Sequence, residues 1–336
     1  MTEDIVAQRR AFTESVLREV SDVLRIELKA VGSEVLCGGT TIYVTGSAGR
    51  GDMGPASDLD PYVIDIDGRA TADQSEAIEG ALKATLLKLG LPELDADGEY
   101  ARLVGAASLL SHLGEPLDDE KGALTKRMLL LLESQPLINP EAYEELLGRV
   151  IDAYWLNEGR HPDDYLPVVL LNDIVRYWRT LLLNHESRLR KKLREQDVSD
   201  ARGLALRHYS SYKLRIPRCM SCFSALLYLL ALTADEPAHV SREDVVAFVR
   251  LQPLGRLEEL KRFDPGVSGQ VDRLGSLYMG FLERSGRGKT ALTDQMERDE
   301  GEVKSVKGDG REFTKIVFEL VQRFGGGREL HRAIVV

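Results

Sequence analysis

The chain contains few cysteines and no long apolar run, and each absence excludes a class of protein. The three cysteines among its 336 residues are too few for a disulfide framework. Cys219 and Cys222 form a C-x-x-C pair without a second pair or a nearby histidine, so we expect small buried residues rather than zinc ligands. No apolar run approaches the length of a membrane span, and the N-terminus MTEDIVAQRR is charged, unlike a signal peptide. We therefore expect a cytoplasmic protein that does not bind membranes.

Aromatic residues are also scarce, at 6% of the chain, but the composition is otherwise that of a globular protein, with 43% apolar and 29% charged residues. A net charge of −10 argues against indiscriminate nucleic-acid binding by the whole surface. The charge is uneven, because residues 186–218 contain ten Arg and Lys against four acids. This region predicts either a surface that meets an anion or an ordinary solvated helical face.

The stretch from Thr41 to Asp67 contains two short apolar runs bounded by glycines, which predict neighbouring strands of a buried sheet. Gly46-Ser47 and a glycine-rich loop follow the first run, and Ser57-Asp58-Leu59-Asp60 opens the second. Alternate residues of a strand share a face, so Asp58 and Asp60 are expected to point the same way.

The two aspartates and the glycine-serine pair predict a phosphate site beside a metal site. Two carboxylates on one face repel each other unless a cation lies between them, and Mg²⁺ prefers such oxygen ligands and binds substrate phosphates as well. Gly46 allows close approach of the backbone, and the amides after it can receive a phosphate if a helix begins there.

Other glycine motifs fit less well. GSAGRG is not G-x-G-x-x-G, and no Lys-Ser or Lys-Thr follows it, which argues against a Rossmann site and excludes a P-loop. The remaining alternative is a solvated turn with two surface aspartates.

The string Gly46 to Gly51, followed by Ser57 to Asp60, resembles the DNA polymerase β-like nucleotidyltransferase superfamily, and in particular the transferase domain of bacterial PII uridylyltransferases. The resemblance covers about 25 residues closely and the rest of the chain more weakly. It implies a nucleoside triphosphate such as ATP or UTP, two Mg²⁺ ions held by Asp58 and Asp60, transfer of the nucleotide to an acceptor hydroxyl, and release of pyrophosphate.

The same resemblance implies roles for further residues. Gly46 and Ser47 would hold the β- and γ-phosphates, with Arg50 as a charge partner and Ser57 also at the nucleotide. A third carboxylate is expected near a strand predicted at 100–104, and the candidates are Asp95 and Asp97, with Glu99 behind them.

The helical part of the chain is expected to supply cations to the triphosphate. On a helix around Asn172, Arg176 and Arg179 lie on an arc away from the apolar face, where they suit phosphate oxygens. They could equally pair with nearby acids, namely Asp163, Asp164 or Asp173. Lys213, just before the helix interruption predicted at Pro217, is the first candidate for the triphosphate.

The predicted fold class is α+β, with a small mixed sheet flanked by helices and followed by a larger all-α bundle. The predicted parts are an N-terminal packing helix at 1–31, a nucleotidyltransferase core at 32–115, a helical domain facing the cleft at 116–286, a mobile charged connection at 287–312, and a C-terminal helix and tail at 313–336.

The full-length uridylyltransferases that the chain resembles carry a His-Asp hydrolase domain, but no histidine here is followed by Asp, so hydrolytic reversal is not expected. The resemblance favours a protein hydroxyl as acceptor, the basic region leaves RNA 3′ ends open, and a nucleotide-binding regulator without turnover is the other alternative.

Overall fold

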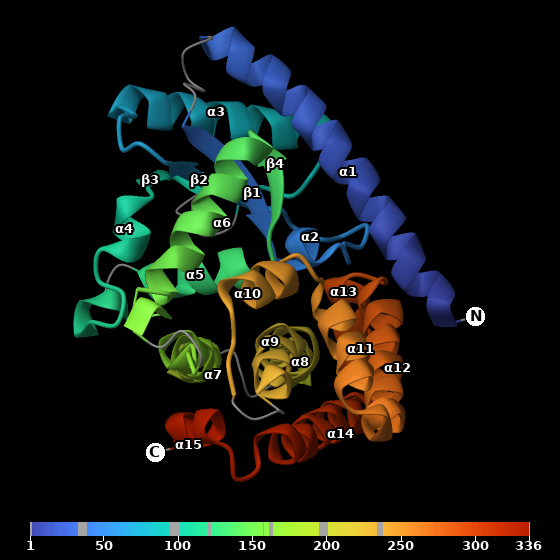
Figure 1. Ribbon diagram of the computed structural model, residues 1–336. Coiled ribbons are helices and arrows are strands. Elements are labelled where there is room, and N and C mark those ends of the chain that lie inside the picture. Colours follow the sequence, from blue (N-terminus) through green and yellow to red (C-terminus); the bar gives the residue numbers. More distant parts are fainter. Residues whose placement is uncertain are drawn as a thin grey trace. The chain divides into compact units, whose positions relative to one another are not determined.

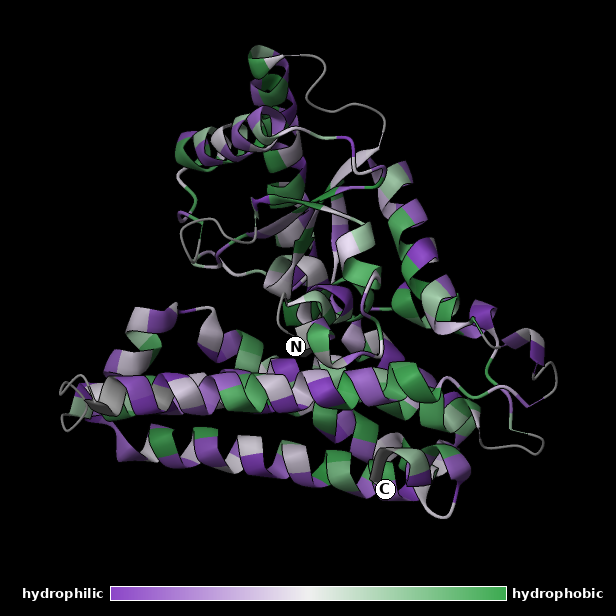
Figure 2. Cartoon of the chain, turned by 90° about the vertical axis from the view of Figure 1, so that its left-hand side faces the viewer, coloured by the Kyte–Doolittle hydropathy of each residue, from purple (hydrophilic) through white to green (hydrophobic). Residues whose placement is uncertain are grey.

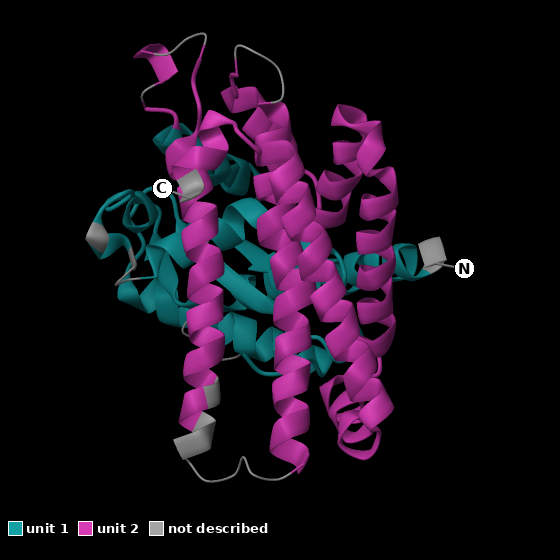
Figure 3. Cartoon of the chain, turned by 90° about the horizontal axis from the view of Figure 1, so that it is seen from below, with its two compact units in different colours: residues 1, 3–154 teal, residues 2, 155–336 magenta. Residues whose placement is uncertain are grey.

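The structure is a computed structural model (Figure 1). It describes residues 2–32, 39–94, 101–119, 122–156, 158–160, 164–194, 201–233 and 238–335. The chain divides into two compact units, which are coloured separately in Figure 3. The first runs from Glu3 to Tyr154 and the second from Trp155 onward.

The first unit is built around a four-stranded mixed sheet in the order β3-β2-β1-β4. Its strands are β1 (Thr40–Thr45), β2 (Asp60–Asp65), β3 (Leu103–Gly105) and β4 (Gln135–Ile138). The central strand β1 is antiparallel to both β2 and β4, whereas β3 is parallel to β2. Its helices are α1 (Thr2–Val31), α2 (Gly46–Arg50), α3 (Ala72–Leu89), α4 (Ala107–Leu110), α5 (Ala123–Leu132) and α6 (Pro140–Tyr154), with the 3₁₀ turn η2 (Pro116–Asp119).

Helices contact both faces of this sheet because its strands are apolar on both sides. Ile42 and Val63, paired across β1 and β2, belong to a buried core that also contains one face of α1 and one face of α3. On the opposite face Tyr43 stacks on Tyr62, with ring centroids 5.4 Å apart, and also contacts Tyr143 of α6. The sheet is therefore a rigid base for whatever lies at its ends.

The second unit consists of helices in its described part. They are α7 (Val168–Arg194), α8 (Ala201–Lys213), the π-helical turn η4 (Leu214–Arg218), α9 (Cys219–Leu232), α10 (Arg242–Val249), α11 (Pro253–Phe263), α12 (Ser268–Ser285), α13 (Lys289–Arg298), α14 (Glu300–Gly325) and α15 (Glu329–Val335), with the short turns η3 (Glu158–Arg160) and η5 (Pro265–Val267). Hydrophilic and hydrophobic residues alternate along the long helices (Figure 2), as amphipathic packing requires.

The helix from α8 through α9 is continuous, and the interruption predicted at Pro217 takes the form of η4. A proline inside a helix removes one backbone donor, and the wider π-turn accommodates that loss. Contrary to the expectation that no apolar run approaches the length of a membrane span, the stretch Ala201–Leu232 is long and apolar enough to qualify as one by composition. Within the protein, 83% of its apolar window is buried, as in a core helix. Cys219 and Cys222 are buried and not in a disulfide, as expected.

The α+β class with a small mixed sheet and a mostly helical remainder is confirmed, and two expectations about the chain's organisation need correction. The units divide after Tyr154 rather than after residue 115, because β4 pairs with β1, α6 packs on both of these strands, and α5 packs on α6. Residues 289–312 are not a mobile connection but form α13 and the first half of α14. Their few apolar residues are concentrated on the buried side, where Leu292, Met296 and Val306 are at most 4% exposed.

Candidate functional site

The end of β1 lies beside the start of β2. In the antiparallel register Thr45 is paired with Asp60, so the chain that leaves β1 at Gly46 passes the Asp60 side chain. Gly46 has a φ of +65°, and a Cβ built on it would lie 2.9 Å from Asp60 Oδ2. The glycine-serine pair and one of the two predicted acids, 14 residues apart in sequence, are therefore in direct proximity.

A short helix begins at this point, as the phosphate hypothesis requires. It is α2, whose C-cap residue Gly51 is in the left-handed conformation, with φ +73°. Gln135 at the start of β4 donates its side-chain amide to the carbonyls of Ala48 and Gly49, at 3.0 and 2.9 Å. The loop is thus tied to the sheet at its far end, while Ser47 at its near end is half-buried, and no described residue hydrogen-bonds to its hydroxyl.

Gly49 has a different role from Gly46. A Cβ on Gly49 would lie 2.0 Å from the backbone carbonyl oxygen of Glu133, just after α5. Only glycine permits this approach of α2 to the backbone, because an added methyl group would overlap the carbonyl. In GSAGRG, Gly46 and Gly51 thus adopt the positive φ angles at the two ends of α2, and Gly49 allows the close packing in its middle.

Asp58 and Asp60 flank Leu59, which is 3% exposed and part of the core on the α1 and α3 side. Both acids are half-buried, so burial alternates as expected for residues that share a face opposite Leu59. Asp60 is the first residue of β2, and Asp58 precedes the strand by two residues. Among the described residues, no hydrogen bond or ion pair holds the Asp58 carboxylate.

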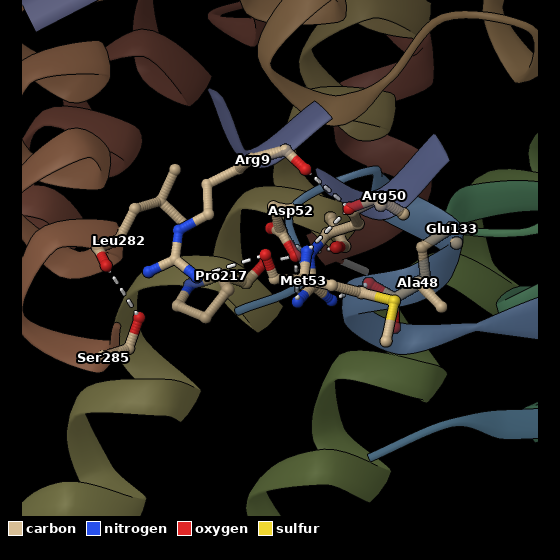
Figure 4. A network of polar contacts seen from close by, with 12 residues as sticks. Arg9, Ala48, Arg50, Asp52, Met53, Glu133, Pro217, Leu282 and Ser285 are labelled. Atoms are coloured by element: carbon tan, nitrogen blue, oxygen red, sulfur yellow. Dashed lines mark hydrogen bonds and ion pairs between the residues drawn. The ribbon is translucent and has the colours of Figure 1, made fainter. Parts of the chain in front are cut away.

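Arg50 forms a network within the first unit (Figure 4). Its guanidinium donates to Asp52 at 2.9 Å and to Glu133 at 2.8 Å, and the side chain is 9% exposed. Arg9 of α1 donates to the carbonyl of Met53 at 3.1 Å and so fixes the next part of the loop. Arg50 therefore holds the glycine loop in place, a structural role that the sequence analysis missed. Its expected role as a phosphate partner gains no support from these contacts.

Ser57 also has a local structural role. Its hydroxyl accepts a hydrogen bond from the Gly54 N–H at 2.8 Å, and its own N–H donates to the Gly54 carbonyl at 2.9 Å. These two bonds close the turn that leads into Asp58 and Asp60. Ser57 therefore positions the acids, and its contact with a nucleotide stays a prediction.

The two candidates for a third carboxylate, Asp95 and Asp97, lie outside the described residues, as does Glu99. The other acid of β2, Asp65, accepts hydrogen bonds from the N–H groups of Asp67 and Ala70 and so closes the turn after the strand. Within the described ranges, no three or more His, Cys, Asp or Glu side chains gather as a metal site. The described part of the site therefore offers two carboxylates.

The predicted cations of the second unit have partners of their own, with one exception. Arg176 binds Asp173 at 2.7 Å, which is one of the alternatives left open by the sequence. Lys213 Nζ lies 5.9 Å from the centre of the Tyr209 ring. Arg179 is exposed, and no described residue is paired with it. Their contact with a triphosphate stays a prediction.

No family model matches the sequence, and no curated protein matches it significantly. The function of the chain therefore has to be argued from the glycine loop, the two aspartates and the contacts that hold them.

Proposed function

We propose that the protein is a Mg²⁺-dependent nucleotidyltransferase that moves a nucleoside monophosphate from a nucleoside triphosphate to an acceptor hydroxyl and releases pyrophosphate. The observation that carries this proposal is the proximity of Gly46 to the Asp60 carboxylate at the paired ends of β1 and β2. A phosphate-binding turn and a metal-binding acid have to be neighbours for this reaction, because the metal shares its ligands with the triphosphate.

The residues present fit a magnesium ion. Asp58 and Asp60 offer only oxygen donors, and Gly46 leaves free the space next to Asp60 that a Cβ would fill. Bound Mg²⁺ would supply charge neutralisation for the triphosphate and acidify the acceptor hydroxyl. The two aspartates would hold the charge of the metal ion in a fixed place. The loop beside them is immobilised by the contacts of Arg50, Gln135 and Ser57.

The first residues of the loop would bind the phosphates. The N–H groups at the start of α2 have no acceptor within the helix, and the Ser47 hydroxyl has no described partner. In nucleotidyl transfer, most of the rate enhancement comes from positioning and electrostatic stabilisation, so the side chains need not form covalent bonds with the substrate.

The acceptor decides which transferase this is. The family resemblance favours a protein hydroxyl, whereas the basic region 186–218 leaves an RNA 3′ end open as a second acceptor. Incubation of the protein with α-labelled ATP or UTP, Mg²⁺ and a cell extract separates the two, because label appears either in a protein band or in RNA.

The same assay tests the site through Asp58→Asn and Asp60→Asn. Each variant should lose label transfer and pyrophosphate release while keeping its circular dichroism spectrum. Asp22→Asn, an exposed acid of α1, is the charge-matched control and should behave as wild type. Normal transfer by both site variants would reject the proposal.

A nucleotide-binding regulator without turnover is the second candidate, because the described residues bring together two acids and not three. Triphosphate binding in calorimetry, without label transfer to any acceptor in the extract, would favour it.

A further inference from the structure

Three arginines and a histidine meet in the second unit. They come from the C-terminal half of α7, which contributes His185 and Arg188, and from η4, which contributes Arg215 and Arg218. Helix α7 packs against both η4 and α9. Burial lowers the pKa of His185, and the positive charges of Arg218, Arg215 and Arg188 lower it further, against the opposing effect of Glu186. The rings of Trp178 on α7 and Phe223 on α9 lie edge to face, with centroids 5.5 Å apart, so the part of α7 after Trp178 lies beside η4, which precedes Phe223. His185 and Arg188 are therefore close to Arg215 and Arg218.

The position of Arg215 is fixed by packing. A Cβ on Gly310 of α14 would lie 3.0 Å from Arg215 Cδ, so the glycine makes room for the aliphatic stem of the arginine. The stem is therefore held against α14, while no described residue pairs with the guanidinium. A side chain that is already ordered loses less entropy when a ligand binds.

The cluster differs from Arg284 of the same unit, which is neutralised by two carboxylates. Arg284 of α12 binds Asp309 at 2.7 Å and Glu302 at 3.0 Å. Arg215 and Arg218 have no such carboxylate among the described residues, and Glu186 is already bound to Arg190 at 2.8 Å. Half-buried like charges without compensation cost free energy, and an anion that binds between them removes that cost.

We propose that His185, Arg188, Arg215 and Arg218 form a phosphate-binding site in the helical unit. Guanidinium groups pair bidentately with phosphate oxygens, and three of them around an imidazole suit a phosphate that carries more than one negative charge or belongs to a chain of phosphates. The ligand is the phosphate group of a linear polyphosphate or of an RNA strand, which share this chemistry. The proposal does not rest on the transferase function, because it uses none of the residues of the glycine loop.

The first test is histidine NMR on the full-length wild-type protein. Added tripolyphosphate or a single-stranded 12-nucleotide RNA should raise the pKa of His185, because a bound phosphate cancels the surrounding positive charge. A response to one ligand alone identifies the source of the phosphate. No change in the His185 resonance at millimolar concentrations of either ligand would overturn the proposal.

The second test measures affinity by calorimetry. The double variant Arg215→Gln/Arg218→Gln should bind the active ligand at least about 100-fold more weakly, since each lost charged contact is expected to cost about tenfold. The matched control is Arg298→Gln/Arg332→Gln, which removes two exposed arginines of the same unit and should bind as wild type. Thermal unfolding checks that the variants are folded, and if the double variant is not, Arg218→Gln alone replaces it with an expected tenfold loss. Unchanged affinity in a folded variant would contradict the assignment.

Discussion

Gly46 and Asp60 are so close that a single methyl group on the glycine would lie 2.9 Å from the carboxylate oxygen Oδ2 of the aspartate. The register of β1 and β2 produces this proximity, because it pairs the last residue of β1 with the first residue of β2. A site that depends on this approach should therefore be sensitive to any side chain at position 46.

The first prediction concerns Gly46→Ala. A left-handed backbone costs a non-glycine residue about 1–2 kcal/mol, so this variant should lose about that much free energy of unfolding in urea denaturation. It should also bind Mg²⁺-nucleotide about tenfold more weakly, because the Asp60 carboxylate has to move. Gly68→Ala is the matched control, since Gly68 has a φ of +68° and nothing within 4 Å of its added Cβ. It should show the same stability loss with normal nucleotide binding, and equal binding by the two variants would contradict the role of the contact.

The second prediction concerns Gly49→Ala. The added methyl group meets the carbonyl oxygen of Glu133 at 2.0 Å, and this backbone atom cannot move aside as a flexible side chain can. We expect a loss of about 3 kcal/mol in the free energy of unfolding. Gly80→Ala, on the exposed side of α3 with nothing within 4 Å, should instead gain about 0.5–1 kcal/mol. Similar effects of the two substitutions in urea titrations would show that α2 does not approach residue 133 so closely.

The third prediction concerns the buried ion pair between Arg127 of α5 and Asp118 of η2, both fully buried. Arg127 Nη1 donates to Asp118 Oδ1 at 2.7 Å, and Arg127 Nε donates to the hydroxyl of Tyr154 at 3.1 Å. Arg127→Met leaves an uncompensated buried carboxylate and should cost about 3–5 kcal/mol of unfolding free energy. Adding Asp118→Leu removes that charge and should restore much of the loss. A double variant as unstable as Arg127→Met would contradict this account.

The fourth prediction is a pH dependence in the second unit. Burial lowers the pKa of His208, and the charges of Lys307 and Arg207 lower it further. The folded state therefore binds fewer protons than the unfolded state below about pH 6.5, the ordinary value for histidine, and stability falls as the pH decreases through this range. His208→Gln should flatten the decline between about pH 7.5 and 5.5, as measured by urea titrations. Lys307→Gln should raise the pKa of His208 in NMR titrations, and an unchanged value would show that the two charges do not interact.

Much of the fold follows from local patterns. Apolar spacing predicts α1. The ends of α3 lie at Thr71 and Gly90, residue types that favour the N-cap and the C-cap of a helix. The proline in a continuous apolar helix predicts the interruption that η4 shows. These features depend on residues close in sequence, which is why the sequence is sufficient for them.

The contacts that hold the candidate site depend on residues far apart in sequence. The residues around GSAGRG do not predict that Gly49 contacts the backbone of Glu133, or that Arg50 binds the Glu133 side chain, which is 83 residues away in sequence. Strand β4, with four residues and a proline, lacks a strand pattern of its own and is stabilised by pairing with β1. The composition of region 289–312 resembles that of a linker, because charged residues greatly outnumber the few apolar residues that α13 and α14 bury.

Calorimetry of Mg²⁺-nucleotide binding to Asp60→Asn tests the central claim most directly, because it needs no knowledge of the acceptor. Wild-type protein and the control Asp22→Asn should both bind ATP or UTP more tightly in the presence of Mg²⁺ than in EDTA. Asp60→Asn should lose the Mg²⁺-dependent part of the affinity while unfolding at the same urea concentration as wild type. Binding by Asp60→Asn with the same affinity and the same Mg²⁺ dependence as wild type would contradict the assignment of this site.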